Sequence, residues 1–128
     1  MKLTYTILYV DNVHKSVDFY QKAFGLKHKF THEGGDYAEM DTGAVTLAFC
    51  GHALAGQIVK RGYQKATQST QIGSQISLYA DDVRSAYEEA IKAGASPIAE
   101  PEIKPWGWEN AMVLDIDGHF VEFAREIK

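Results

Sequence analysis

Residues 9–27, YVDNVHKSVDFYQKAFGLK, decide the fold because a later stretch repeats their pattern. Seventy residues further on, residues 79–97 read YADDVRSAYEEAIKAGASP, and Tyr, Asp, Val, Lys and Ala recur in register. Each copy is an apolar strand end, an Asp or Asn cap, about three helical turns and a glycine. A period near 70 is too long for a solenoid, so the two copies indicate two half-modules of one small domain.

The first copy predicts a strand followed by a helix. Residues 4–10 alternate along the chain, so that Tyr5, Ile7 and Tyr9 share one face of a strand. A helix is predicted over residues 13–24, because apolar residues there recur at helical spacing. This apolar stripe has steps of four, three and four residues and consists of Val13, Val17, Tyr20 and Phe24.

The remaining apolar segments complete two βαβββ modules. Further strands of the first module are predicted at residues 26–31, 37–41 and 44–50. The second module is predicted to contain a strand at 74–80, a helix that begins at Val83 and is ended by Gly94, and strands near 96–99, 110–115 and 119–125. The predicted fold class is α+β, with the two modules forming a curved mixed sheet around a cleft, where a ligand is expected.

We expect a single domain over residues 1–128, with module one at 1–50, a linker at 51–72 and module two at 73–128. The linker is predicted to be a loop, because it has no strong period and many Gly, Gln, Ser and Thr residues. Pro101 and Pro105 are expected to lie in another loop of the second module.

The composition argues against several classes of function. A net charge of −4 in 128 residues argues against a nucleic-acid partner, which needs clustered Lys and Arg. Cys50 is the only cysteine, so no intramolecular disulfide is possible. No run approaches the ~20 apolar residues of a membrane span. We therefore expect a cytoplasmic protein with no membrane partner.

A second correspondence relates the last strands of the two modules. Residues 42–48 lie over residues 117–123 with an offset of 75, which pairs Leu47 with Glu122. The offset of 70 pairs Tyr5 with Gln75. These four positions are predicted to face one another across the cleft. Strand alternation turns Glu122 into the cleft and turns Val121 and Phe123 towards a helix.

Two motifs resemble those of the vicinal oxygen chelate superfamily, which includes glyoxalase I, extradiol dioxygenases and bleomycin-resistance proteins. The first is D-N-V-x-K-S-V-D-F-Y–x4-G-L over residues 11–26. The second is the tail W-G-W-E-N–x4-D-I-D-G-H-F-V-E-F over residues 106–123, in which Ile116 replaces the usual proline. The resemblance covers nearly the whole chain and implies the paired-module fold and a homodimer.

The resemblance also implies where a metal ion would bind in the metal-using members. Their four ligands are His or Glu residues on the first and last strands of each module, which correspond here to Tyr5, Leu47, Gln75 and Glu122. Only Glu122 is a strong ligand, whereas a Zn²⁺ or octahedral site normally takes three or more. We therefore expect no metal and no cofactor, as in the bleomycin-resistance-like members.

The leading prediction is a protein that binds a small organic molecule, such as a planar or cationic antibiotic. Trp106 and Trp108 suit stacking on a planar ligand, although one tryptophan here could instead seal a dimer interface or the edge of the core. Leu47 and Phe49 would make the cleft apolar, but core packing explains them as well. The predicted ligand-binding residues are Tyr5, Ile7, Leu47, Phe49, Gln75, Trp106, Trp108 and Glu122.

Glu122 allows two further interpretations. It could be an acceptor that is only hydrogen-bonded to Tyr5 or Gln75, without any function. It could also be a catalytic base in a glyoxalase-like lyase, isomerase or dioxygenase, which is the alternative prediction.

Overall fold

The computed structural model describes residues 1–128. The chain divides into two compact units, Met1–Lys65 and Ala66–Lys128. The first unit contains β1 (Tyr5–Val10), α1 (Val13–Phe24), β2 (Lys27–Thr31), β3 (Tyr37–Asp41), β4 (Thr46–Gly51) and α2 (His52–Val59). The second unit contains β5 (Gln75–Tyr79), α3 (Val83–Lys92), β6 (Ser96–Ile103), β7 (Trp108–Leu114) and β8 (Phe120–Glu126).

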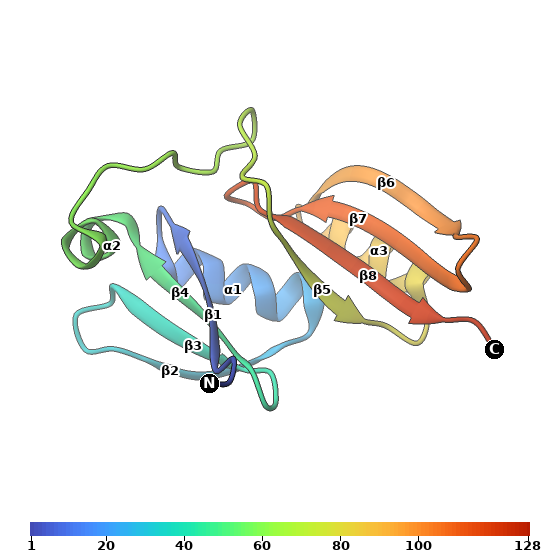
Figure 1. The fold of residues 1–128 in the computed structure, drawn as a ribbon, viewed down its shortest axis with the longest axis horizontal. Coiled ribbons are helices and arrows are strands. Elements are labelled where there is room, and N and C mark those ends of the chain that lie inside the picture. The colour runs from blue at the N-terminus through green and yellow to red at the C-terminus, as the bar shows by residue number, and fades with distance from the viewer. The chain divides into compact units, whose positions relative to one another are not determined.

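Each unit has one four-stranded mixed sheet with the same topology (Figure 1). The first sheet has the order β1-β4-β3-β2, and the second has the order β5-β8-β7-β6. The first strand of each unit runs parallel to the last strand, and the other pairs are antiparallel. The predicted α+β fold with two βαβββ modules is confirmed. The cleft between the modules stays a prediction.

The capping residues of α1 and α3 show how the repeated stretch folds. Asn12 caps α1, because its Oδ1 accepts a hydrogen bond from the Lys15 backbone N–H at 3.0 Å. Asp82 does the same for α3 through the Ser85 N–H at 3.0 Å. Gly25 ends α1 with a φ of 66°, a left-handed conformation that glycine adopts without steric cost.

Each sheet packs one face against a helix. In the first unit the apolar stripe of α1 meets β4, where the rings of Tyr20 and Phe49 have centroids 4.8 Å apart. In the second unit Val83, Tyr87 and Ala90 of α3 are buried. Val121 and Phe123 of β8 are buried as well, as strand alternation predicts. These two helix-covered faces hold much of the core.

The structure differs from the sequence prediction at two segments. The predicted loop at 51–72 begins with the helix α2, whose sequence HALAGQIV is apolar nearly all round and therefore lacks a clear stripe. Strand β6 continues through Pro101 instead of ending near residue 99. Pro101 is tolerated because β6 is an edge strand and its register with β7 shifts between Ala99 and Glu102.

Residues 66–74 belong to the second unit and pack on its β7–β8 turn. Gln68 donates a side-chain hydrogen bond to the Asp115 carbonyl at 2.8 Å. Gly118 approaches the Thr67 carbonyl so closely that an added Cβ would collide with it. The boundary between the compact units therefore falls inside the predicted linker, and the single-domain prediction stays a prediction. None of the helices is long and apolar enough to cross a membrane.

Candidate functional site

The face of the second sheet opposite α3 carries a row of side chains around Glu122. Glu122 lies between Ser77 of β5 and Met112 of β7, which are its partners in the sheet register. Paired residues project to the same face of a sheet, so all three lie opposite the buried Val121 and Phe123. Glu122 is half-buried, and its placement follows from the alternation along β8.

Both carboxylate oxygens of Glu122 accept short hydrogen bonds. The Ser77 hydroxyl donates to Oε1 at 2.6 Å, and the Asn110 amide donates to Oε2 at 2.6 Å. Gln75 extends this group, because its amide donates to Ser77 Oγ at 3.1 Å. We call these four residues the Glu122 cluster. The predicted link between Glu122 and Gln75 therefore exists within the second unit, but it passes through Ser77.

One acceptor of the Glu122 cluster has no partner. Asn110 Oδ1 is buried and makes no hydrogen bond. A buried polar atom without a partner costs about 1–3 kcal/mol, and such atoms are uncommon in folded proteins. The cluster therefore lacks one hydrogen-bond donor.

Aromatic side chains flank the cluster on the same face. Trp108 opens β7 two residues before Asn110 and is half-buried. Tyr79 follows Ser77 at the next position on this face and is 67% exposed. Trp106 lies in the β6–β7 turn, which the Gly107 N–H closes on the Lys104 carbonyl, and it is 68% exposed. Trp108 and Tyr79 therefore provide ring surfaces beside the polar cluster.

In the first unit the structure places the predicted residues on two different faces. Tyr5 and Ile7 lie on the edge strand β1, opposite α1, and are 47% and 44% exposed. Leu47 and Phe49 lie on the other face, where they are buried under α1. The predicted placement of these two residues on the ligand side of the sheet is wrong, because both are part of the core.

The correction follows from the register of the last strands. Ala48 pairs with Ile7 as Glu122 pairs with Ser77, so Ala48 is the counterpart of Glu122 and the offset is 74, not 75. The turn glycines Gly43 and Gly118 align with an offset of 75, because Gly43 lies three residues before the start of β4 and Gly118 only two residues before the start of β8. A slip of one residue moves a side chain to the opposite face of a strand.

The first unit carries a buried carboxylate that the sequence pattern does not single out. Glu39 of β3 is in register with Ala48 and is 6% exposed. The Tyr37 hydroxyl donates to Glu39 Oε2 at 2.8 Å, and Lys29 Nζ lies 3.8 Å from Oε1. Burial raises the pKa of the Tyr37 phenol above its ordinary value, and the hydrogen bond to Glu39 raises it further. Tyr37 therefore stays a neutral donor.

The residues at the family's ligand positions do not fit a metal ion. With the corrected register, the last-strand positions hold Ala48 and Glu122, and the first strands offer only Tyr5, Ile7, Gln75 and Ser77. Both oxygens of Glu122 already accept hydrogen bonds. No group of three or more His, Cys, Asp or Glu residues is arranged to hold a metal ion.

The sequence and the fold match those of known proteins. A family model described as "Glyoxalase/Bleomycin resistance protein/Dioxygenase superfamily" matches residues 2–123. The chain belongs to this superfamily. It is 30% identical over 132 aligned residues to a lactoylglutathione lyase of Neisseria meningitidis serogroup A, covering 98% of this chain and 91% of that protein.

Solved structures of the superfamily share the fold at lower sequence identity. A glyoxalase-related enzyme from Fulvimarina pelagi has a TM-score of 0.84 at 19% identity, covering 97% of this chain and 87% of that chain. A glyoxalase/bleomycin resistance protein/dioxygenase family enzyme from Burkholderia phytofirmans PsJN also has a TM-score of 0.84, at 20% identity, covering 99% of this chain and all of that chain. These structures show the shared fold, and the family model confirms the predicted superfamily.

Proposed function

We propose that this superfamily member binds a small organic molecule, without a metal ion, at the Glu122 cluster of the second sheet. The observation that carries the proposal is the buried Asn110 Oδ1, which lacks a donor. The ligand class that supplies one is a planar compound bearing an N–H group, such as an amidine, an amine or an amide.

Each part of such a ligand has a counterpart on the face opposite α3. The N–H group would donate to Asn110 Oδ1, and a positive charge would be attracted by the adjacent Glu122 carboxylate. The planar body would stack on Trp108 or Tyr79. Sequestration needs only binding, so no bond-making residue is required. The predicted homodimer and cytoplasmic location remain predictions.

The experiment is a calorimetric titration with three probes of one shape. Biphenyl-4-carboxamidine has N–H donors and a positive charge, biphenyl-4-carboxamide has donors only, and biphenyl-4-carboxylate has neither. The amidine should bind most tightly, the amide more weakly, and the carboxylate should not bind. Equal affinity for the amidine and the carboxylate would overturn the proposal.

Substitutions locate the probe. Glu122→Gln should weaken amidine binding roughly tenfold or more, because hydrogen bonds to charged groups are the stronger kind. Asn110→Ala should weaken both the amidine and the amide. Glu89→Gln, an exposed glutamate of α3 on the opposite side of the sheet, is the matched control and should leave binding unchanged. An affinity that neither cluster variant changes would show that the probe binds elsewhere.

A lyase is the second candidate, and the 30% identity to a lactoylglutathione lyase over 98% of the chain is the observation that favours it. The donor set described above argues against the metal chemistry of the family. A lactoylglutathione lyase assay without and with added Ni²⁺ or Zn²⁺ separates the two functions. Turnover that Glu122→Gln abolishes would establish the lyase, and its absence under both conditions favours binding alone.

A further inference from the structure

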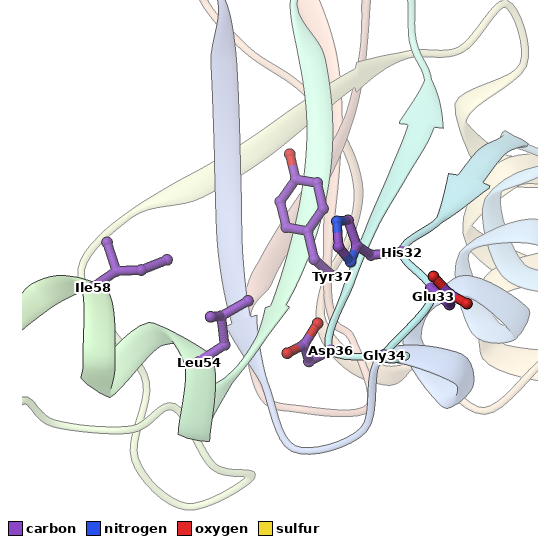
Figure 2. Close-up of a pocket in the computed structure, with 7 residues that line it drawn as sticks. All are labelled: His32, Glu33, Gly34, Asp36, Tyr37, Leu54 and Ile58. Atoms are coloured by element: carbon purple, nitrogen blue, oxygen red, sulfur yellow. The ribbon is translucent and has the colours of Figure 1, made fainter.

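A groove in the first unit has no place in the proposed function. It lies between α2 and the end of the β2–β3 hairpin and has a volume of about 780 Å³. Figure 2 shows Leu54 and Ile58 extending from α2 towards Tyr37 and Asp36 on the hairpin. Ligand pockets commonly measure about 300–1,000 Å³, so this groove can hold a small organic molecule.

Backbone hydrogen bonds fix the two walls of the groove relative to each other. The Gly51 N–H, at the start of α2, donates to the Asp36 carbonyl at 2.9 Å. The His32 N–H donates to the Tyr37 carbonyl at 2.8 Å and so closes the hairpin end. The groove is therefore formed before any ligand binds, which reduces the conformational entropy that is lost on binding.

The walls differ in chemical character. Leu54 and Ile58 are four residues apart on α2 and form one apolar strip, of which Ile58 is 64% exposed. The hairpin wall carries the Glu33 and Asp36 carboxylates together with the His32 side chain, and it contains no lysine or arginine. Neither carboxylate forms an ion pair. The groove is thus apolar on one side and negatively charged on the other.

Tyr37 completes the hairpin wall. Its hydroxyl donates to Glu39, which holds the ring in one orientation along the groove. The phenol stays neutral, because burial and Glu39 both raise its pKa. The face of a neutral aromatic ring attracts an organic cation within about 6 Å of its centre.

We propose that this groove binds a small organic cation with an apolar body, at a site built from residues of the first unit alone. The apolar body would lie on Leu54 and Ile58. The cationic group would lie between Asp36 and the ring of Tyr37. The charge of the hairpin wall selects the sign of the ligand charge. The proposal stands whether or not the Glu122 cluster binds a ligand, because all the residues that line the groove belong to the first unit.

The test uses 3-phenylpropyltrimethylammonium, which carries a positive charge but no N–H donor and so cannot satisfy Asn110. It is titrated into the ¹⁵N-labelled full chain and followed by backbone amide shifts. Shifts should concentrate at residues 32–37 and 52–60. The neutral 4-phenylbutan-1-ol should cause weaker shifts, and the anionic 4-phenylbutanoate none. No shift at these residues, or equal shifts with the anion, would overturn the proposal.

Variants with matched controls separate charge from apolar contact. Asp36→Asn should weaken binding of the cation roughly two- to fivefold, as expected for an exposed ion pair. Asp81→Asn, at an exposed aspartate outside the groove, should leave binding unchanged. Ile58→Ala should weaken binding of the cation about three- to tenfold. Ile103→Ala is the control, since Ile103 of the second unit is 66% exposed and thus matches Ile58. Equal effects of Ile58→Ala and Ile103→Ala would contradict the proposal.

A second copy of the chain is the other possible occupant of the apolar strip. Light scattering of the wild type and of Ile58→Asp decides this point. An unchanged mass agrees with a ligand site. A drop to half the mass in Ile58→Asp would show that the strip is an interface between copies, and the ligand proposal would fail.

Discussion

Asn110 donates its side-chain N–H to Glu122 Oε2 at 2.6 Å, while its own Oδ1 is buried without a partner. The hydrogen bond fixes which way the amide faces, because a flipped amide would set a carbonyl oxygen against a carboxylate. The relationship thus leaves an acceptor at a defined place beside a negative charge. From this geometry we propose a donor-bearing ligand.

The hydrogen bond between Ser77 and Glu122 should be measurable as a coupling energy. We expect Ser77→Ala and Glu122→Gln, made singly and together, to show a coupling of about 1 kcal/mol in urea unfolding. The control cycle pairs Ser77→Ala with Glu126→Gln, which lies roughly 13 Å further along β8. That control should be additive within about 0.5 kcal/mol. A Ser77–Glu122 coupling no larger than in the control would contradict the observed hydrogen bond.

The corrected placement of Leu47 predicts a difference in stability. Leu47 is 4% exposed under α1, whereas Ile7 on the opposite face is 44% exposed. Leu47→Ala should therefore lower the free energy of unfolding by about 2–5 kcal/mol, and Ile7→Ala by only about 1 kcal/mol. Chemical denaturation of both variants is the measurement. Similar losses of stability in the two variants would contradict the buried position of Leu47 and agree with the face that the offset of 75 predicts.

The two turn glycines should respond differently to alanine. Gly43 and Gly118 have nearly equal φ values of 93° and 90°. A Cβ at Gly43 meets no atom within 4 Å, so Gly43→Ala should cost only the left-handed strain of about 1–2 kcal/mol. A Cβ at Gly118 collides with the Thr67 carbonyl, so Gly118→Ala should cost about 1–3 kcal/mol more. Equal melting temperatures would show that residues 66–74 do not pack on this turn.

Tyr37 predicts a loss of stability at high pH. Burial, and then the hydrogen bond and charge of Glu39, raise its pKa in the folded chain above the ordinary value of 10.0. The unfolded chain therefore loses this proton first. The contribution of Tyr37 to stability should be fully present below pH ~10 and should be lost as the pH rises above it. Tyr37→Phe should remove this part of the loss, and Glu39→Gln should reduce it. Unfolding curves between pH 8 and 11 that coincide for the wild type and Tyr37→Phe would contradict the assignment.

Much of the fold could be predicted from the sequence because local rules set it. The stripe of α1, its cap and its glycine are all contained in residues 9–27, and strand alternation correctly turns Glu122 away from Val121 and Phe123. Helix α2 could not be predicted from its pattern, since a helix that is apolar nearly all round has no stripe.

The candidate site could be predicted only in part, because its geometry depends on contacts across strands. Ser77 shares a face with Gln75 by simple alternation, so the sequence could have included it. Asn110 could not be linked to Glu122 without the β7–β8 register. The error at Leu47 has the same origin, since aligning glycines in two turns does not fix the register of the strands that follow them.

The most direct measurement is the metal content of the full chain purified without chelator, determined by mass spectrometry together with protein concentration. Binding at the Glu122 cluster without a metal predicts far less than one metal ion per chain, and amidine binding that a chelator leaves unchanged. One Ni²⁺, Zn²⁺, Mn²⁺ or Fe²⁺ per chain, lost in Glu122→Gln, would contradict it.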